Sequence, residues 1–195
     1  MKSLLLFCLL GFFAGPLAAQ NWKSPLPVDS SSGYIVYRGR MDAPGQTPVQ
    51  SAARAIRFAR TELKSTPSGL LVDSSKVSQL SISGSAERRL LWHGGIQGSA
   101  GRILRYEVVI RPKAGYYEYE ISDLVNETPA VHVQSVAGIV TSTAPKTSAV
   151  EAIIRNSTSY DKKHRPTAAF KSYCEAVDNS IQTVIADLRR ALVPN

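Results

Sequence analysis

Residues 102–124 read RILRYEVVIRPKAGYYEYEISDL, and the predicted fold is built outward from this stretch. Side chains alternate along Arg102 to Pro112 with the two-residue period of a β-strand that buries one face. Lys113-Ala114-Gly115 forms a tight turn, and Tyr116 to Leu124 returns as a second alternating strand. A turn this short favours antiparallel pairing. The residues predicted on the core face are Leu104, Tyr106, Val108 and Ile110 in the first strand, and Tyr117, Tyr119 and Ile121 in the second.

Further strands are predicted on both sides of this hairpin. Gly33 to Gly39 holds a short aromatic and β-branched run, and Val77 to Trp92 indicates a long strand with a bulge at Gly84. A short apolar segment, Leu70 to Val72, lies between them. After the hairpin, Val131 to Val140 is expected to add one more short strand. Residues 141–147 are expected to be a loop, and residues 150–154 a helical turn.

Two helices are predicted from hydrophobic periodicity. The first has Thr47 as its N-cap and Pro48 at its first position, and it runs to about Lys64. Its predicted apolar face consists of Ala52, Ala55, Ile56, Phe58, Ala59 and Leu63. Pro166 opens the second helix, which ends near Val193 and has the strongest periodic signal in the chain. Its apolar positions are Phe170, Cys174, Val177, Ile181, Val184, Leu188 and Ala191.

The order of elements is therefore β-α-β-β-β-β-α. Helices confined to one face of an antiparallel sheet define an α+β domain. The sequence predicts a sheet of about five strands with two helices on one face, in a single domain at residues 33–193. Residues 126–165 are expected to form a long irregular segment.

The first residues have the three parts of a secretory signal peptide. Lys2 supplies a positive start, residues 4–13 form an apolar block, and Ala18 and Ala19 are the small residues of a cleavage site. We expect a signal peptide at residues 1–19, an extended Pro- and Ser-rich leader at 20–32, and an exported protein, periplasmic or extracellular. An uncleaved N-terminal anchor is the alternative. Cys8 lies inside the apolar block, which argues against a lipoprotein.

Local motifs of the chain resemble a domain-of-unknown-function family with a TATA-binding-protein-like fold, typical of exported proteins in Gram-negative bacteria. The resemblance spans about Val28 to Leu192. It rests on residues 33–37, 55–59, 105–110, 113–117 and 150–151, of which the first are Gly33-Tyr34-Ile35-Val36-Tyr37. Phe58 stands where the family usually has tryptophan, and Ala114 and Tyr116 also depart from its pattern. The resemblance implies the fold and leaves the activity open.

Composition excludes several classes of protein. The chain has 195 residues, 44% of them hydrophobic, which suffices for a folded core, and a formal net charge of +8. No apolar run reaches the roughly 18–20 residues that a membrane span needs. Without residues 1–19 the sole cysteine is Cys174, so an intramolecular disulfide is excluded. We expect Cys174 to be buried, the alternative being an exposed reactive thiol.

No catalytic or metal-binding motif is recognisable, and no cofactor is predicted. His93, His132 and His164 lie in separate segments without ligand spacing. No G-x-S-x-G motif surrounds Ser83 or residues 157–159. The glycines of 93–101 lack the lysine of a phosphate-binding loop and indicate a hairpin loop instead.

Two basic features remain as candidate binding surfaces. Arg54, Arg57, Arg60 and Lys64 share one face of the first helix, and Lys162-Lys163-His164-Arg165 forms a short basic run. The helix face is the candidate anion-binding site, although solvated charges that only maintain solubility are the ordinary alternative.

These observations favour a non-enzymatic binding or interaction module of the cell envelope, with an envelope protein, glycan or anionic lipid as partner. One alternative is a hydrolase whose site is assembled from scattered residues such as His93, Glu118 and Glu120. Nucleic-acid binding is a second alternative, which the export signal makes unlikely.

Overall fold

The computed structural model describes residues 23–63, 71–73, 81–90, 102–129, 131–134 and 140–193. The signal peptide predicted at 1–19, Lys64 and the loop 93–101 lie outside the described residues. Along the chain the elements are β1 (Tyr37–Asp42), α1 (Pro48–Thr61), β2 (Leu71–Asp73), β3 (Ser81–Leu90), β4 (Arg102–Lys113), β5 (Tyr116–Thr128), β6 (Val131–Gln134), β7 (Val140–Thr143), β8 (Lys146–Ala149), α2 (Val150–Arg155), the 3-10 turn η3 (Ser157–Ser159) and α3 (Ala168–Leu192).

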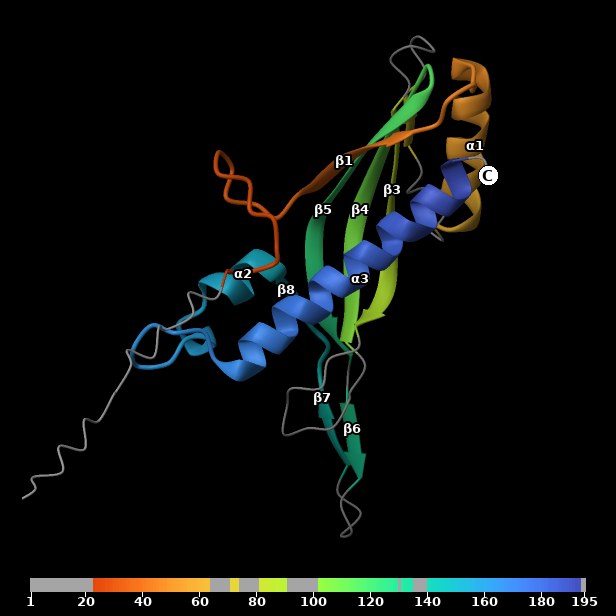
Figure 1. The fold of residues 1–195 in the computed structure, drawn as a ribbon. Coiled ribbons are helices and arrows are strands. Elements are labelled where there is room, and N and C mark those ends of the chain that lie inside the picture. Colours follow the sequence, from red (N-terminus) through yellow and green to blue (C-terminus); the bar gives the residue numbers. More distant parts are fainter. Residues whose placement is uncertain are drawn as a thin grey trace, which may run out of the picture.

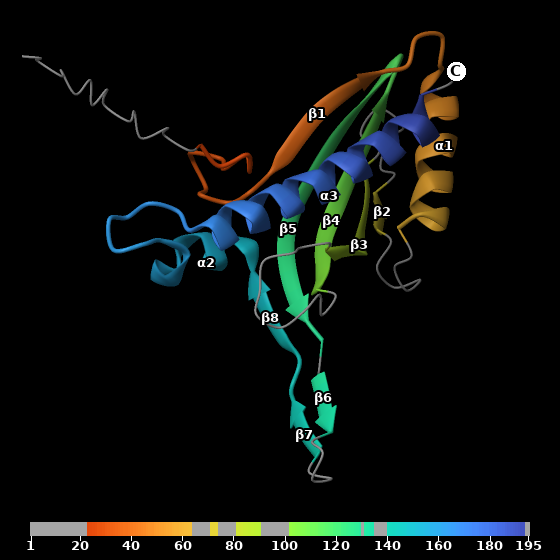
Figure 2. The same cartoon turned by 60° about the horizontal axis from the view of Figure 1, so that its bottom comes forward.

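One antiparallel sheet carries the fold, with strands in the order β1-β5-β4-β3-β2. β8 also pairs with β5, beyond the end of β1, while β6 and β7 form a separate hairpin. Helices α1 and α3 lie across the same face of the sheet, and Figures 1 and 2 show α3 crossing it diagonally. The α+β class is confirmed, and the predicted elements occur in the predicted order, with β6, β7, β8 and α2 in addition before α3.

Helix α1 begins at a capping box. Gln50 N–H donates to Thr47 Oγ1 at 3.3 Å, and Thr47 N–H donates to Gln50 Oε1 at 3.0 Å. Ala55, Phe58 and Ala59 are buried against the sheet, which confirms the predicted apolar face. The small alanine side chains let the helix backbone approach closely.

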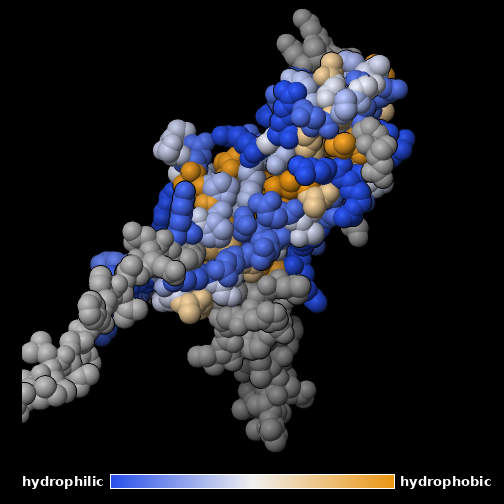
Figure 3. Space-filling view, viewed as in Figure 1, coloured by the Kyte–Doolittle hydropathy of each residue, from blue (hydrophilic) through white to orange (hydrophobic). Residues whose placement is uncertain are grey.

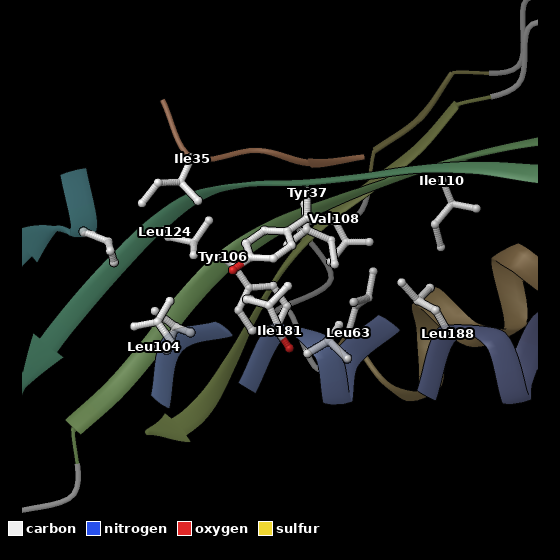
Figure 4. Close-up of a cluster of buried hydrophobic side chains, with 14 of the residues drawn as sticks. Ile35, Tyr37, Leu63, Leu104, Tyr106, Val108, Ile110, Leu124, Ile181 and Leu188 are labelled. Carbon is white, nitrogen blue, oxygen red and sulfur yellow. The ribbon is translucent and has the colours of Figure 1, made fainter. Parts of the chain in front are cut away.

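The core lies between the sheet and the two helices (Figure 4). Leu104, Tyr106, Val108 and Ile110 of β4 all point into it, as predicted. Cys174 is fully buried in α3, and its prediction as a core residue is confirmed. Ala191 is exposed, contrary to the prediction, and Leu192 is buried in its place. An α-helix has 3.6 residues per turn, so the next inward-facing position after Leu188 is Leu192, four residues further along the chain.

A β-bulge that the sequence did not predict lies in β5. Glu107 of β4 pairs with Ser122, but Arg105 pairs with Val125, so β5 contains one extra residue. Asp123 adopts a φ of 51° at this point. The extra residue shifts the alternation, so that Ile121 and Leu124 both point inward.

Three local predictions are wrong. Gly84 is not a bulge, because β3 pairs with β4 in unbroken register from Ile82 to Leu90. The first strand begins at Tyr37, since Ile35 forms only an isolated bridge with Val28. Residues 141–147 are not all loop, because β7 ends at Thr143 and β8 begins at Lys146. Within 126–165 the chain also forms β6 and α2, the latter where a helical turn was expected.

Candidate functional site

The candidate anion-binding face consists of Arg54, Arg57 and Arg60 on α1. Arg57 and Arg60 are exposed, and Arg54 is half-buried. Burial raises the pKa of Tyr117, and the positive charge of Arg54 offsets part of that rise. The sequence predicted that solvent reaches all four basic residues of this face. That holds for Arg57 and Arg60 and only in part for Arg54; Lys64 lies outside the described residues. Three arginines at intervals of three residues form one stripe, opposite the apolar face that packs on the sheet.

The arginines of this face differ from most others in their surroundings. Helix α1 contains no acidic residue, and within the described part of the chain none of its arginines forms an ion pair. Among the other described arginines, seven are ion-paired with carboxylates, whereas Arg89, Arg155 and Arg189 form no ion pair within the described residues. These ion-paired residues are Arg38, Arg40, Arg88, Arg105, Arg111, Arg165 and Arg190. The α1 face therefore has positive charge that no carboxylate of the described residues neutralises through an ion pair.

On the sheet face turned away from the helices, arginine side chains instead form ion pairs with acidic side chains. Arg38 donates to Glu120 at 3.0 Å and to Asp29 at 2.8 Å, and Arg105 lies 2.8 Å from Glu127. Hydrogen bonds from Ser31 and Arg38 hold the pKa of Asp29 well below its usual range. Arg40 stacks on the ring of Tyr116 at 3.9 Å. This alternation of acid and base lacks the single-sign charge that attracts a phosphate backbone.

The residues considered for hydrolase chemistry do not form a described cluster. Glu118 and Glu120 share the outer face of β5, and Glu120 is paired with Arg38 and lies 4.0 Å from Arg111. His93 lies outside the described residues. The side chain of His132 is not described either, and His164 sits in an exposed turn. No group of three potential metal ligands occurs among the residues that the structure describes.

Two other candidates from the sequence have local structural roles. The Ser159 hydroxyl donates to the carbonyl of Ile153 at 2.7 Å, which closes the turn after α2. In the basic run 162–165, the Asp161 carboxylate accepts from the backbone N–H groups of Lys163 and Arg165. It also accepts from the guanidinium of Arg165 at 2.9 Å. These hydrogen bonds lower the pKa of Asp161.

The sequence did not predict a cleft between β1 and α3. It has a volume of about 400 Å³. The residues lining it are Pro25, Pro27, Val36, Tyr37, Arg38, Tyr119, Asp178, Gln182 and Ile185. Within it the Tyr37 hydroxyl donates to Asp178 Oδ1 at 2.9 Å, and burial together with this carboxylate raises the pKa of Tyr37. Tyr37 and Asp178 are 141 residues apart, so no local motif could reveal the pair.

Over the side drawn in Figure 3, hydrophilic side chains predominate, with small apolar areas between them. The described part of the chain contains no helix long and apolar enough to cross a membrane.

Two solved structures resemble this chain in their overall fold. One is a DUF4468 family protein from Bacteroides ovatus, with 12% sequence identity and a TM-score of 0.60, covering 86% of this chain and 91% of that one. The other is a TBP-like protein from Parabacteroides distasonis, with 17% identity and a TM-score of 0.57, covering 85% of this chain and 96% of that one. The fold is TBP-like.

This likeness confirms the fold implied by the sequence resemblance to a domain-of-unknown-function family. At 12% and 17% identity it concerns the fold alone, and fold does not determine function. No family model matches the chain, and no curated protein matches it. Any statement about function therefore has to come from the surfaces described above.

Proposed function

We propose that this protein is an exported, non-enzymatic binding module of the cell envelope, and that the α1 face binds phosphate-bearing lipid headgroups. The observation that carries the proposal is the uncompensated charge of Arg54, Arg57 and Arg60. Guanidinium groups form strong, often bidentate hydrogen bonds with phosphate oxygens. Arg57 and Arg60 are exposed, so a ligand can approach them without displacing a carboxylate.

Two features of the whole chain support this proposal. The segment 1–19 has the layout of a secretory signal peptide, which would deliver the protein to the envelope. The formal charge of +8 adds a long-range attraction toward an anionic surface. Such binding is governed by screened charge, because the Debye length is only about 8 Å at physiological ionic strength.

The test is cosedimentation of the protein that lacks residues 1–19 with phosphatidylglycerol-containing vesicles and with pure phosphatidylcholine vesicles, at low and moderate salt. The variant replaces Arg54, Arg57 and Arg60 with glutamine. A matched control replaces Arg105, Arg111 and Arg165 with glutamine, which removes the same charge from ion-paired positions.

The expected result is salt-sensitive binding to the anionic vesicles that the α1 variant loses and the control variant largely keeps. Equal binding by the two variants would show that net charge alone is responsible and would refute a specific role for α1. An acidic polysaccharide that competes more strongly than the vesicles would identify a glycan as the ligand and contradict the lipid assignment.

A further inference from the structure

The outer edge of β1 has free backbone hydrogen-bonding groups. β1 is the terminal strand of its sheet, as Figures 1 and 2 show, and its inner edge pairs with β5 from Tyr37 to Asp42. Val36 N–H donates to Pro27 O on the outer side at 3.0 Å, while Ala43 N–H donates to Gly115 O on the inner side at 2.8 Å. Backbone groups alternate between the two edges of a strand. The N–H and C=O groups of Arg38, Arg40 and Asp42 therefore point outward, and no described residue pairs with them.

The cleft beside this edge contains a carboxylate without a positive partner. Asp178 accepts from the Tyr37 hydroxyl at 2.9 Å and from the Gln182 amide at 3.4 Å, and it forms no ion pair within the described part of the chain. Arg38 also borders the cleft, but Asp29 and Glu120 hold its guanidinium. A half-buried carboxylate in these surroundings favours a cation supplied from outside.

The outer edge of β1 and the carboxylate of Asp178 lie next to each other. A strand added to an edge turns every second side chain toward each face of the sheet. On the face covered by the helices, such side chains would point into the cleft at Asp178, whose lining also includes Tyr37 and Tyr119. Aromatic rings next to a carboxylate suit the stem and the charged head of a lysine or arginine side chain.

We propose that β1 binds an extended peptide segment of a partner protein as an additional strand, with a lysine or arginine side chain of that segment inserted in the cleft against Asp178. A second copy of this chain is a poor occupant. The side chains that its β1 turns toward the helices, Tyr37 and Met41, carry no positive charge that could pair with Asp178. This inference is independent of the α1 face and of lipid binding.

The probe is a capped nine-residue peptide of alternating threonine and valine with a central lysine, compared with the same peptide carrying methionine at the centre. Binding is followed by NMR titration of the 15N-labelled protein. We expect the lysine peptide to shift the amide signals of Arg38 and Arg40 and to slow their hydrogen exchange.

Three variants separate the parts of the proposal. Asp178→Asn keeps an acceptor for the Tyr37 hydroxyl but removes the negative charge. It should lower the affinity for the lysine peptide about tenfold and leave the affinity for the methionine peptide unchanged. Arg40→Pro removes one outward N–H group, and an edge strand tolerates a proline. This variant should have a lower affinity for both peptides. Glu175→Gln removes an exposed charge from the same helix and should change neither.

Several results would overturn the inference. Absence of lysine-peptide binding up to millimolar concentration would refute it. Equal affinity for Asp178→Asn and the wild type would exclude the charge contact. Unchanged binding by Arg40→Pro would exclude strand addition. Since lipid vesicles have no role in these titrations, failure here and failure of the α1 proposal remain distinguishable.

Discussion

Glu151 is the residue whose replacement tests the packing of the N-terminal segment most directly. The residue is only 8% exposed, and its Oε1 accepts from the backbone N–H of Ile35 at 2.9 Å. Ile35 is fully buried and precedes β1, so its N–H has no access to water. Arg155, one turn later in α2, donates to the carbonyl of Gly33 at 3.0 Å. Together the two side chains fix the segment that leads into the sheet.

The expected magnitudes follow from these contacts. Glu151→Ala removes the acceptor and leaves a buried N–H without a partner, which costs about 2–3 kcal/mol of the free energy of unfolding. Glu151→Gln retains a carbonyl acceptor and loses only the charge assistance, so its cost should be about 1 kcal/mol. Arg155→Ala serves as a control at an exposed position, with a cost below about 1 kcal/mol.

Urea denaturation followed by circular dichroism measures all three variants. The slope of the free energy against urea should remain unchanged, since none of the variants alters the surface exposed on unfolding much. Hydrogen exchange at the Ile35 amide should be protected in Glu151→Gln and accelerated in Glu151→Ala. If Glu151→Ala lies within about 0.5 kcal/mol of the wild type, the hydrogen bond does not anchor the segment and the reasoning fails.

Three further outcomes are expected. Phe58→Ala should lower the free energy of unfolding by about 3–5 kcal/mol in urea, because the side chain is buried under α1; a loss below about 1 kcal/mol would contradict that packing. Burial raises the pKa of the Cys174 thiol to about 11 from an ordinary value near 9, so its contribution to stability is complete below pH 9 and is lost as the pH rises toward 11. Cys174→Ala should therefore flatten the decline of melting temperature over that interval, and an identical decline would exclude the thiol as its cause. Asp123→Gly should stay within about 0.5 kcal/mol of the wild type, whereas Asp123→Val should lose about 1–2 kcal/mol, because a β-branched residue disfavours the positive φ; equal melting temperatures for the two variants would argue against the bulge.

The parts of the fold that sequence predicts are those determined by local periodicity. The strand alternation of 102–113 and the apolar stripe of α3 each repeat several times, so one misplaced residue such as Ala191 does not hide the element. The bulge at Asp123 depends instead on pairing. Residues 116–121 of β5 pair with β1, and residues 125–128 pair with β8. The strand therefore changes its pairing partner on the two sides of the extra residue. No pattern within β5 itself specifies two partners.

The candidate sites also differ in how much of each the sequence alone can predict. The stripe of Arg54, Arg57 and Arg60 follows from helical spacing, and a sequence suffices to find it. Whether an arginine is compensated depends on residues far along the chain, such as Asp187 for Arg88 and Glu120 for Arg38. Spacing along the sequence therefore cannot show which arginines have a carboxylate partner. The structure shows carboxylate partners for seven arginines and none, among the described residues, for Arg54, Arg57 and Arg60.

The exposed edge of β1 is short, and its length decides what it can bind. On one side the leader covers it as far as Val36, through the hydrogen bond to Pro27, and on the other the backbone turns inward at Ala43. Between these limits the outward groups belong to Arg38, Arg40 and Asp42, and charged side chains on an edge strand discourage aggregation. A long, flat and apolar edge would aggregate, but this one presents few hydrogen bonds and depends on an additional contact for affinity. Asp178 lies beside it in the cleft and offers that contact to a basic side chain alone. The arrangement therefore selects against self-association and in favour of a partner segment that is both extended and basic.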